Sequence, residues 1–179
     1  MVYLFLADGF EEIEALCVLD LLRRNKVETK TIGVTGKTVN GSHNIPVICD
    51  ATENEISVSD DFDMIILPGG LPGSDNLNES KVVDAFIKKA KKEDKFICAI
   101  CAAPYVLGVR GILENKNATC YPGFENRLKG ANYINTGVVR DGKIITARAM
   151  GSATDFALEI IEALLGKEAR EKTKSSIIY

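Results

Sequence analysis

Short apolar runs that resemble buried strands alternate along this chain with segments of helical period, and this alternation limits the possible folds more than any other feature. The strand-like runs are "VYLFLA", "VETKTIGV", "DMIILPGG" and "KFICAI", at residues 2–7, 27–34, 63–70 and 95–100. Helical spacing of apolar residues appears at 11–24, 80–93, 103–113 and 152–166. Strands that are apolar along their whole length are typical of a parallel sheet covered on both faces. The sequence therefore predicts a doubly wound α/β fold with helices on both faces of the sheet.

The helical periods also predict which side chains face the core. We expect the helix at 80–93 to bury Val83, Phe86, Ile87 and Ala90. The helix at 11–24 places Ile13, Leu16, Cys17 and Leu21 on its buried face.

The last third of the chain contains two strand-like runs within residues 132–148, around the turn dipeptide Asp141-Gly142. Ser152 is a candidate cap for the following helix, and Gly166 is a candidate stop. A short helix is expected after Gly166, whereas residues 35–50 look irregular.

Composition narrows the class of protein. With 179 residues and 46% hydrophobic content, the chain suits one domain over residues 1–179. A net charge of −3 with interspersed signs gives no basic face for a nucleic acid. No apolar run reaches the length of a membrane span, and no basic leader precedes the first acidic residues. Five cysteines at irregular spacing favour free thiols in a reducing compartment. A cytoplasmic location without membrane or nucleic-acid partners is the expectation.

Three strand ends carry distinctive residues: "ADGFEEIE", "LPGGLPGSDN" and "ICAAP". Ligands of open parallel sheets bind outside the carboxyl ends of the strands. We therefore expect these three segments to converge on one site.

Cys101 is the candidate nucleophile of that site. It follows a strand and precedes small residues that begin a helix, as in the nucleophile elbow, where a tight turn holds the side chain at the end of the sheet. Cys17, Cys49 and Cys98 are interpreted as packing residues.

The pair Cys98 and Cys101 also spells C-x-x-C. Three residues of an extended strand span roughly 10 Å, whereas the Cα atoms of a disulfide lie within about 7 Å. Zinc needs more ligands than a chain with a single histidine and no second C-x-x-C offers. A disulfide and a metal site are both disfavoured.

Glu14 is the candidate acid partner of Cys101. Acids in the first turn of a helix stabilise the helix dipole, which accounts for Glu11 and Glu12. Glu14 lies between apolar neighbours, so a second role is open to it: a protonated Glu14 donates a hydrogen bond to a thiolate, and an ionised one acts as a base. Backbone N–H groups in Pro68 to Gly70, including those of Gly69 and Gly70, and the N–H of Ala102 are candidates for binding an oxyanion.

With these residues in view, the chain resembles the ThiJ/PfpI superfamily, in the branch of the Parkinson-associated deglycase (DJ-one) and its bacterial relatives. The matching segments are "ADGFEEIEA", "DMIILPGG", "NLNES", "ICAICAAP" and "FALEIIEALLGKE", in order and over essentially the whole chain. The resemblance implies a flavodoxin-like fold, a homodimer, Cys101 as the reactive cysteine, Glu14 as its hydrogen-bonded carboxyl partner, and Gly70 and Ala102 at the oxyanion pocket.

The chain departs from the family pattern at two places. Tyr121, in "ATCYPGF", stands where relatives commonly have a histidine near the cysteine. The protease-like branch has a histidine directly after its cysteine, and here that residue is Ala102. His43, the only histidine, would have to reach the site for a Cys-His-acid protease, and a local hydrogen bond in its loop is the simpler role. Protease activity is therefore disfavoured.

The resemblance implies cysteine-dependent removal of methylglyoxal and glyoxal, or of their adducts, by a glyoxalase or deglycase that uses no cofactor. Tyr121 is a candidate for orienting the substrate. Two alternatives remain open: a redox sensor or chaperone that uses oxidation of Cys101 without turnover, and a catalytically silent homologue.

Overall fold

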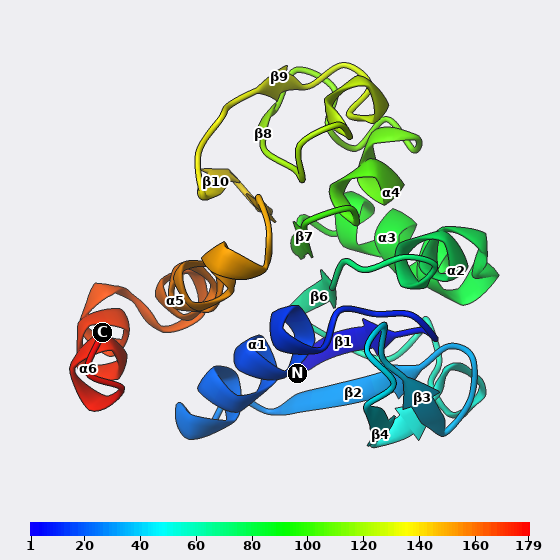
Figure 1. The fold of residues 1–179 in the computed structure, drawn as a ribbon, viewed down its shortest axis with the longest axis horizontal. Helices are drawn as coiled ribbons and strands as arrows, with labels where there is room; N and C mark the ends of the chain where they lie inside the picture. The colour runs from blue at the N-terminus through cyan, green and yellow to red at the C-terminus, as the bar shows by residue number, and fades with distance from the viewer.

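The computed structural model describes residues 1–179 and has one main sheet with helices on both sides (Figure 1). The strands of this sheet are β1 (Val2–Leu6), β2 (Thr29–Gly33), β5 (Ala51–Thr52), β6 (Met64–Leu67), β7 (Phe96–Ile100), β10 (Val138–Asp141) and β11 (Ile144–Ala147). The α-helices are α1 (Glu12–Arg24), α2 (Gly73–Glu79), α3 (Lys81–Lys92), α4 (Pro104–Gly108), α5 (Ala153–Leu165) and α6 (Lys167–Ser176).

The seven strands follow the order β10-β11-β7-β6-β1-β2-β5. All neighbours are parallel except β10 and β11, which are antiparallel. This topology confirms the predicted doubly wound, flavodoxin-like α/β fold.

Shorter elements lie outside the main sheet. They are β3 (Thr38–Asn40) and β4 (Pro46–Ile48), which form an antiparallel pair, β8 (Asn117–Ala118) and β9 (Asn132–Tyr133), which form a parallel pair, and the 3-10 helices η1 (Glu53–Glu55), η2 (Glu125–Arg127) and η3 (Met150–Ser152). The segment that looked irregular in the sequence is thus partly a hairpin. None of the helices is long and apolar enough to cross a membrane.

Each face of the sheet has its own hydrophobic core, because successive side chains of a strand point to opposite faces. Tyr3 and Phe5 of β1 pack in the core that α3 and α4 cover. Leu4 and Leu6 pack in the core that α1 and α5 cover. This double burial explains why the strands are apolar along their whole length. In Figure 1, α5 and α6 lie on the same side of the sheet as α1, and α2, α3 and α4 lie on the other.

The predicted buried face of α3 is confirmed, since Val83, Phe86, Ile87 and Ala90 are all buried. The prediction for α1 is wrong in part. Leu21 is buried, but Ile13 is 53% exposed and Leu16 and Cys17 are only half-buried. The helix is rotated so that two acids face inward, and the residues buried on α1 are Glu12, Glu14, Ala15, Val18, Leu21 and Leu22.

The helix expected at 103–113 is also shorter than predicted. Only Pro104–Gly108 is α-helical, and turns follow it. Two glycines, Gly108 and Gly111, lie within four residues and lower the helix propensity of this segment.

Candidate active site around Cys101 and Glu14

Cys101 lies in the sharp turn between β7 and α4 and is partly exposed. Its φ angle is +65°, in the left-handed region that residues other than glycine rarely adopt. A strained backbone of this kind persists only where the surrounding structure holds it, and it is commonly found at functional sites. The turn has the position predicted from the sequence and places the side chain at the carboxyl end of the sheet.

Glu14 comes from the first turns of α1, and its side chain is 1% exposed. The backbone N–H of Gly69 donates a 2.9 Å hydrogen bond to Glu14 Oε2. A Cβ atom added at Gly69 would lie 2.5 Å from both the Cys101 Cβ and Glu14 Oε2. The cysteine and the carboxyl group therefore meet across a position that only glycine can occupy.

Burial raises the pKa of Glu14 to about 7, because the charged carboxylate is poorly solvated. A hydrogen bond with the Cys101 thiol lowers the pKa of Glu14, and so do hydrogen bonds from the N–H groups of Gly69 and Met150. The negative charge of Glu11 raises the pKa further. A carboxyl that titrates near neutral pH is suited to general acid–base catalysis.

Burial also raises the pKa of Cys101, to about 12, and the charge and hydrogen bond of Glu14 raise it further. The backbone N–H groups of Ala102 and Gly70 oppose the rise. Above pH 7 the resting pair is therefore a thiol beside a carboxylate. Of the two roles that the sequence left open for Glu14, this arrangement favours the base. Because Oε2 accepts the Gly69 N–H, Oε1 is the oxygen of Glu14 that can take up a proton.

Two backbone N–H groups, from Gly70 and Ala102, face the Cys101 sulfur. Gly70 has φ +87°, and a Cβ on it would collide with the backbone of the Gly9–Glu11 loop. Gly69 differs from the prediction, because its N–H is committed to Glu14 and is not available for an oxyanion.

The Tyr121 backbone N–H donates a 2.8 Å hydrogen bond to the Cys101 carbonyl oxygen. Its side chain is 47% exposed. The backbone thus holds Tyr121 next to Cys101.

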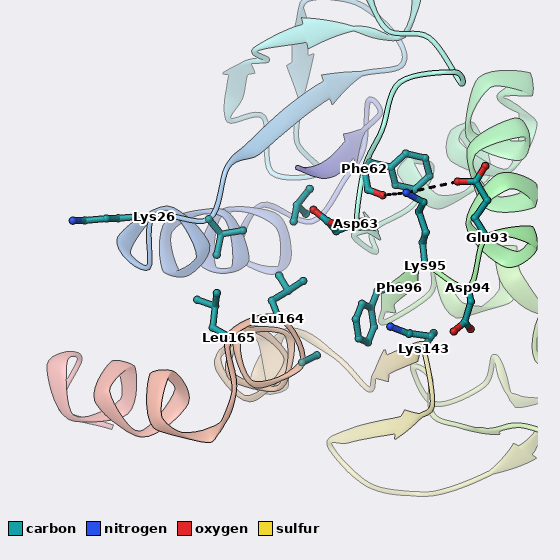
Figure 2. A pocket seen from close by; sticks show the side chains of 13 residues that line it. Lys26, Phe62, Asp63, Glu93, Asp94, Lys95, Phe96, Lys143, Leu164 and Leu165 are labelled. Atoms are coloured by element: carbon teal, nitrogen blue, oxygen red, sulfur yellow. Dashed lines mark hydrogen bonds and ion pairs between the residues drawn. The ribbon is translucent and has the colours of Figure 1, made fainter.

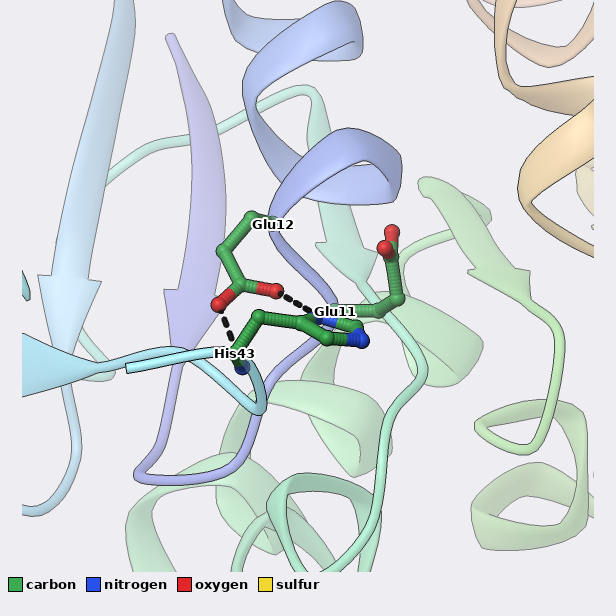
Figure 3. A group of neighbouring side chains, drawn as sticks. All are labelled: Glu11, Glu12 and His43. Carbon is green, nitrogen blue, oxygen red and sulfur yellow. Dashed lines mark hydrogen bonds and ion pairs between the residues drawn. The ribbon is translucent and has the colours of Figure 1, made fainter. Parts of the chain in front are cut away.

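His43 is bound to Glu12 and not to Glu14 or Cys101 (Figure 3). Its Nδ1 lies 2.8 Å from Glu12 Oε2, and its backbone N–H donates a 2.7 Å hydrogen bond to Oε1. The local hydrogen bond expected for this histidine is also present, between His43 Nδ1 and Ser42 Oγ at 3.1 Å, whereas the contact with Glu12 was not predicted. Burial alone would raise the pKa of Glu12, but its hydrogen bonds to His43 and Ser42 lower the pKa to about 2. The ionised carboxylate of Glu12 therefore holds the 41–43 loop in place through hydrogen bonds.

Glu11, Glu12 and His43 each place one potential metal-binding atom within 4.8 Å of the others. Both oxygens of Glu12 already accept hydrogen bonds from Ser42 and His43. The closeness of these three side chains is therefore explained by the hydrogen bonds that hold the loop and does not require a metal ion.

Sequence reasoning missed two neighbours of Glu14. Glu11 is the N-cap of α1, and its Oε2 accepts a 2.7 Å hydrogen bond from the Glu14 backbone N–H. Glutamate is not among the preferred N-cap residues, so the sequence signals only that acids gather in the first turn. The other neighbour is Met150, whose N–H faces the Glu14 carboxyl from η3; no sequence pattern indicates it.

A separate pocket of about 520 Å³ opens at the amino ends of β1 and β7, at the end of the sheet opposite Cys101 (Figure 2). Among the charged residues that line it, Lys95 pairs with Glu93 at 3.6 Å, and Asp63 pairs with the N-terminal amine of Met1 at 2.6 Å. None of the reactive residues of the candidate site lines this pocket.

The family model described as the DJ-1/PfpI family matches residues 1–163. The chain belongs to the DJ-1/PfpI family. It is 36% identical over 176 residues to protein dj-1beta of Drosophila melanogaster, covering 97% of this chain and 94% of that protein. The crystal structure of Drosophila DJ-1beta superposes with a TM-score of 0.94 at 35% identity, covering 99% of this chain and 96% of the other.

Other relatives extend the comparison. The chain is 33% identical over 167 residues to the glutathione-independent glyoxalase DJR-1.2 of Caenorhabditis elegans, covering 92% of this chain and 87% of that protein. It is 36% identical to protein DJ-1 homolog B of Arabidopsis thaliana. The match includes 96% of this chain and 40% of the length of the Arabidopsis protein. The family resemblance found in the sequence motifs is thereby confirmed.

Proposed function

We propose that this DJ-1/PfpI family member is a cysteine-dependent enzyme that removes reactive dicarbonyls such as methylglyoxal and glyoxal, or their adducts, without a cofactor. The main support for the proposal is that the Cys101 thiol lies next to the buried carboxyl of Glu14. Burial raises the pKa of this carboxyl to about 7. The name of the Caenorhabditis elegans relative, a glutathione-independent glyoxalase, supports the same reaction class.

The reaction begins with attack of the Cys101 sulfur on the aldehyde carbon. A sulfur–carbon bond forms, and the thiol proton passes to the Glu14 carboxylate. The carbonyl π electrons move to oxygen, where the N–H groups of Gly70 and Ala102 stabilise the charge, and the protonated Glu14 returns the proton to give a hemithioacetal.

Glu14 then removes the proton from the former aldehyde carbon, and the C–H bonding electrons form the C=C bond of an enediol as the neighbouring carbonyl oxygen takes up a proton. The protonated Glu14 returns its proton to the neighbouring carbon, and the hydroxyl on the sulfur-bearing carbon loses its proton as the thioester C=O forms, so that one proton has moved from carbon to carbon and one from oxygen to oxygen. This internal redox step converts the hemithioacetal into a thioester of a 2-hydroxy acid. Water hydrolyses the thioester, which releases the hydroxy acid and regenerates the thiol. The sum is dicarbonyl plus water to hydroxy acid, so no external oxidant or reductant is consumed.

The alternatives receive less support. A sensor that is oxidised at Cys101 needs a thiolate at neutral pH, because the thiolate is the oxidised species. Burial and the Glu14 charge raise the pKa of Cys101 to about 12, so oxidation, like attack on an aldehyde, would depend on Glu14 to take up the thiol proton. The glyoxalase name of the Caenorhabditis elegans relative favours turnover over a sensor. A silent homologue would not need a partly exposed thiol held at φ +65° beside a buried acid.

We also propose that the chain, taken as one domain over residues 1–179, acts as a homodimer in the cytoplasm. Ile13 is 53% exposed and Met150 is 51% exposed, next to the two segments that contribute Glu14 and its Met150 N–H contact. A second copy packed on these apolar side chains would cover the edge of the candidate site.

The test is incubation of the purified protein with methylglyoxal and with glyoxal, following loss of the dicarbonyl and appearance of the hydroxy acid. The wild-type protein is expected to form lactate from methylglyoxal and glycolate from glyoxal. The Cys101→Ser variant should lose this activity, and full activity in Cys101→Ser would exclude the proposal.

A further inference from the structure

Three hydrogen bonds form a closed ring between the start of α1 and the loop after β6. The Glu11 backbone N–H donates to the Gly69 carbonyl oxygen at 2.9 Å, and the Gly69 N–H donates to Glu14 Oε2 at 2.9 Å. The Glu14 backbone N–H closes the ring by donating to Glu11 Oε2 at 2.7 Å. The ring fixes both the backbone and the carboxyl group of Glu14 relative to Gly69, the residue next to the N–H of Gly70.

We propose that Glu11 is a positioning residue that holds Glu14 against Cys101 through this ring of hydrogen bonds and places a second negative charge beside the Glu14 carboxyl. This role rests on the proposed function of Glu14 as the base for Cys101. Glu11 touches neither the cysteine nor the reacting atoms in this account. It acts through the hydrogen bond from the Glu14 N–H and through its own negative charge.

The groups that face Glu14 come from four segments. Glu11 approaches from the start of α1 and Cys101 from the turn after β7, and these are the two titratable groups. Gly69, from the loop after β6, and Met150, from η3, contribute backbone N–H groups. Glu11 is therefore the one carboxylate in this set that opposes ionisation of Glu14, and removing its charge should make Glu14 a stronger acid.

A capping carboxylate usually stabilises its helix whatever the helix does elsewhere. The two roles of Glu11 separate in the variant Glu11→Gln. The amide oxygen of glutamine still accepts the hydrogen bond from the Glu14 N–H, whereas the charge is gone. A residue that only capped α1 would leave the titration of the site unchanged in this variant.

The experiment is the rate of alkylation of Cys101 by iodoacetamide from pH 5 to 9, read by peptide mass spectrometry, in wild type, Glu11→Gln and Asp20→Asn. Asp20 is the matched control, because it is an exposed acid of the same helix that pairs with Arg24 at 2.6 Å. We expect the midpoint of the Glu11→Gln profile to move to lower pH and that of Asp20→Asn to coincide with wild type. Thermal unfolding of each variant verifies that it is folded.

The outcomes separate this inference from the proposed function. A wild-type transition near neutral pH with an unchanged Glu11→Gln midpoint would overturn the role of Glu11 alone. A wild-type profile without such a transition would overturn both the role of Glu11 and the base assigned to Glu14. A shifted Glu11→Gln midpoint supports the role of Glu11 even if the protein consumes no dicarbonyl, because alkylation does not depend on that turnover.

Discussion

The Gly69 N–H donates a 2.9 Å hydrogen bond to Glu14 Oε2, and this bond fixes a buried acid beside Cys101. Gly69 also leaves the space in which the two side chains meet, since a Cβ there would lie 2.5 Å from the Cys101 Cβ and from Glu14 Oε2. The residue between the acid and the nucleophile therefore sets their geometry without taking part in the chemistry.

The variant Gly69→Ala should accordingly displace both side chains. We expect a loss of dicarbonyl consumption of at least about tenfold, since small misplacements of reacting groups are costly. Forcing a methyl group into a packed site should also lower the free energy of unfolding by about 1–3 kcal/mol. Gly151→Ala is the matched control, because a Cβ at Gly151 meets nothing within 4 Å. Equal activity of the two variants would contradict this view of Gly69.

The raised pKa of Glu14 also predicts how stability depends on pH. Folding raises this pKa from 4.5 to about 7, so the folded protein holds the proton more tightly than the unfolded chain. The stabilisation from proton binding is complete below pH 4.5 and is lost as the pH rises through about 7. Glu14→Gln should therefore be more stable than wild type at pH 8, by on the order of 2–3 kcal/mol, and similar to it at pH 4.

Urea unfolding of the two proteins at both pH values is the measurement. Glu12→Gln provides a control of opposite sign, because the pKa of Glu12 is lowered to about 2 and its carboxylate stabilises the fold above pH 4.5. Glu12→Gln should be less stable than wild type at pH 8. A Glu14→Gln variant destabilised to the same degree at both pH values would argue against a raised pKa for Glu14.

His43 should be dispensable for chemistry. Its side chain is 70% exposed, and its contacts are to Glu12 and Ser42. Dicarbonyl consumption by His43→Ala should stay within about threefold of wild type, as for a surface residue outside the reacting groups. The same assay with Cys101→Ser gives the scale of a catalytic loss. A rate for His43→Ala as low as that of Cys101→Ser would show that the histidine is needed for catalysis.

The proposed dimer makes a prediction about α1. Placing a charge on an apolar surface that is buried between copies is costly, so Ile13→Glu should convert the dimer into a monomer. Sedimentation velocity measures this change directly. Val109→Glu is the control, because Val109 is 41% exposed just after α4, on the opposite face of the sheet. Identical sedimentation of wild type and Ile13→Glu would mean that this surface is not the interface.

The sequence alone predicts much of the fold. Strands that are apolar on both faces must be covered on both sides, and amphipathic helices such as α3 can provide that cover, so few arrangements of strands and helices are possible. The turn that exposes Cys101 is also predictable, since it follows from a strand end joined to small residues. The buried face of α1 is not, because periodicity assigns acids to solvent. In the structure Glu12 and Glu14 point inward, where hydrogen bonds from the 42–43 segment and from Gly69 compensate for their burial.

The pairing of Glu12 with His43 escapes sequence reasoning for a related reason. The two residues are 31 positions apart, and the hairpin of β3 and β4 that brings His43 to Glu12 is formed by very short strands. The raised pKa of Cys101 was also beyond prediction, because it depends on how deeply the thiol is buried and on the charge beside it. The Glu12–His43 pairing and the pKa of Cys101 both depend on contacts between residues far apart in the sequence, so local sequence patterns do not predict them.

The proposed reaction depends on Glu14, which removes the proton of Cys101 during attack on a dicarbonyl. Its most direct test is the rate of methylglyoxal consumption from pH 5 to 9 by wild type and by Glu14→Gln. The wild-type rate should rise with a midpoint near pH 7, the pKa to which burial raises Glu14, and Glu14→Gln should be slower by about a hundredfold with no such rise. A Glu14→Gln variant with the rate and pH profile of wild type would contradict the claim.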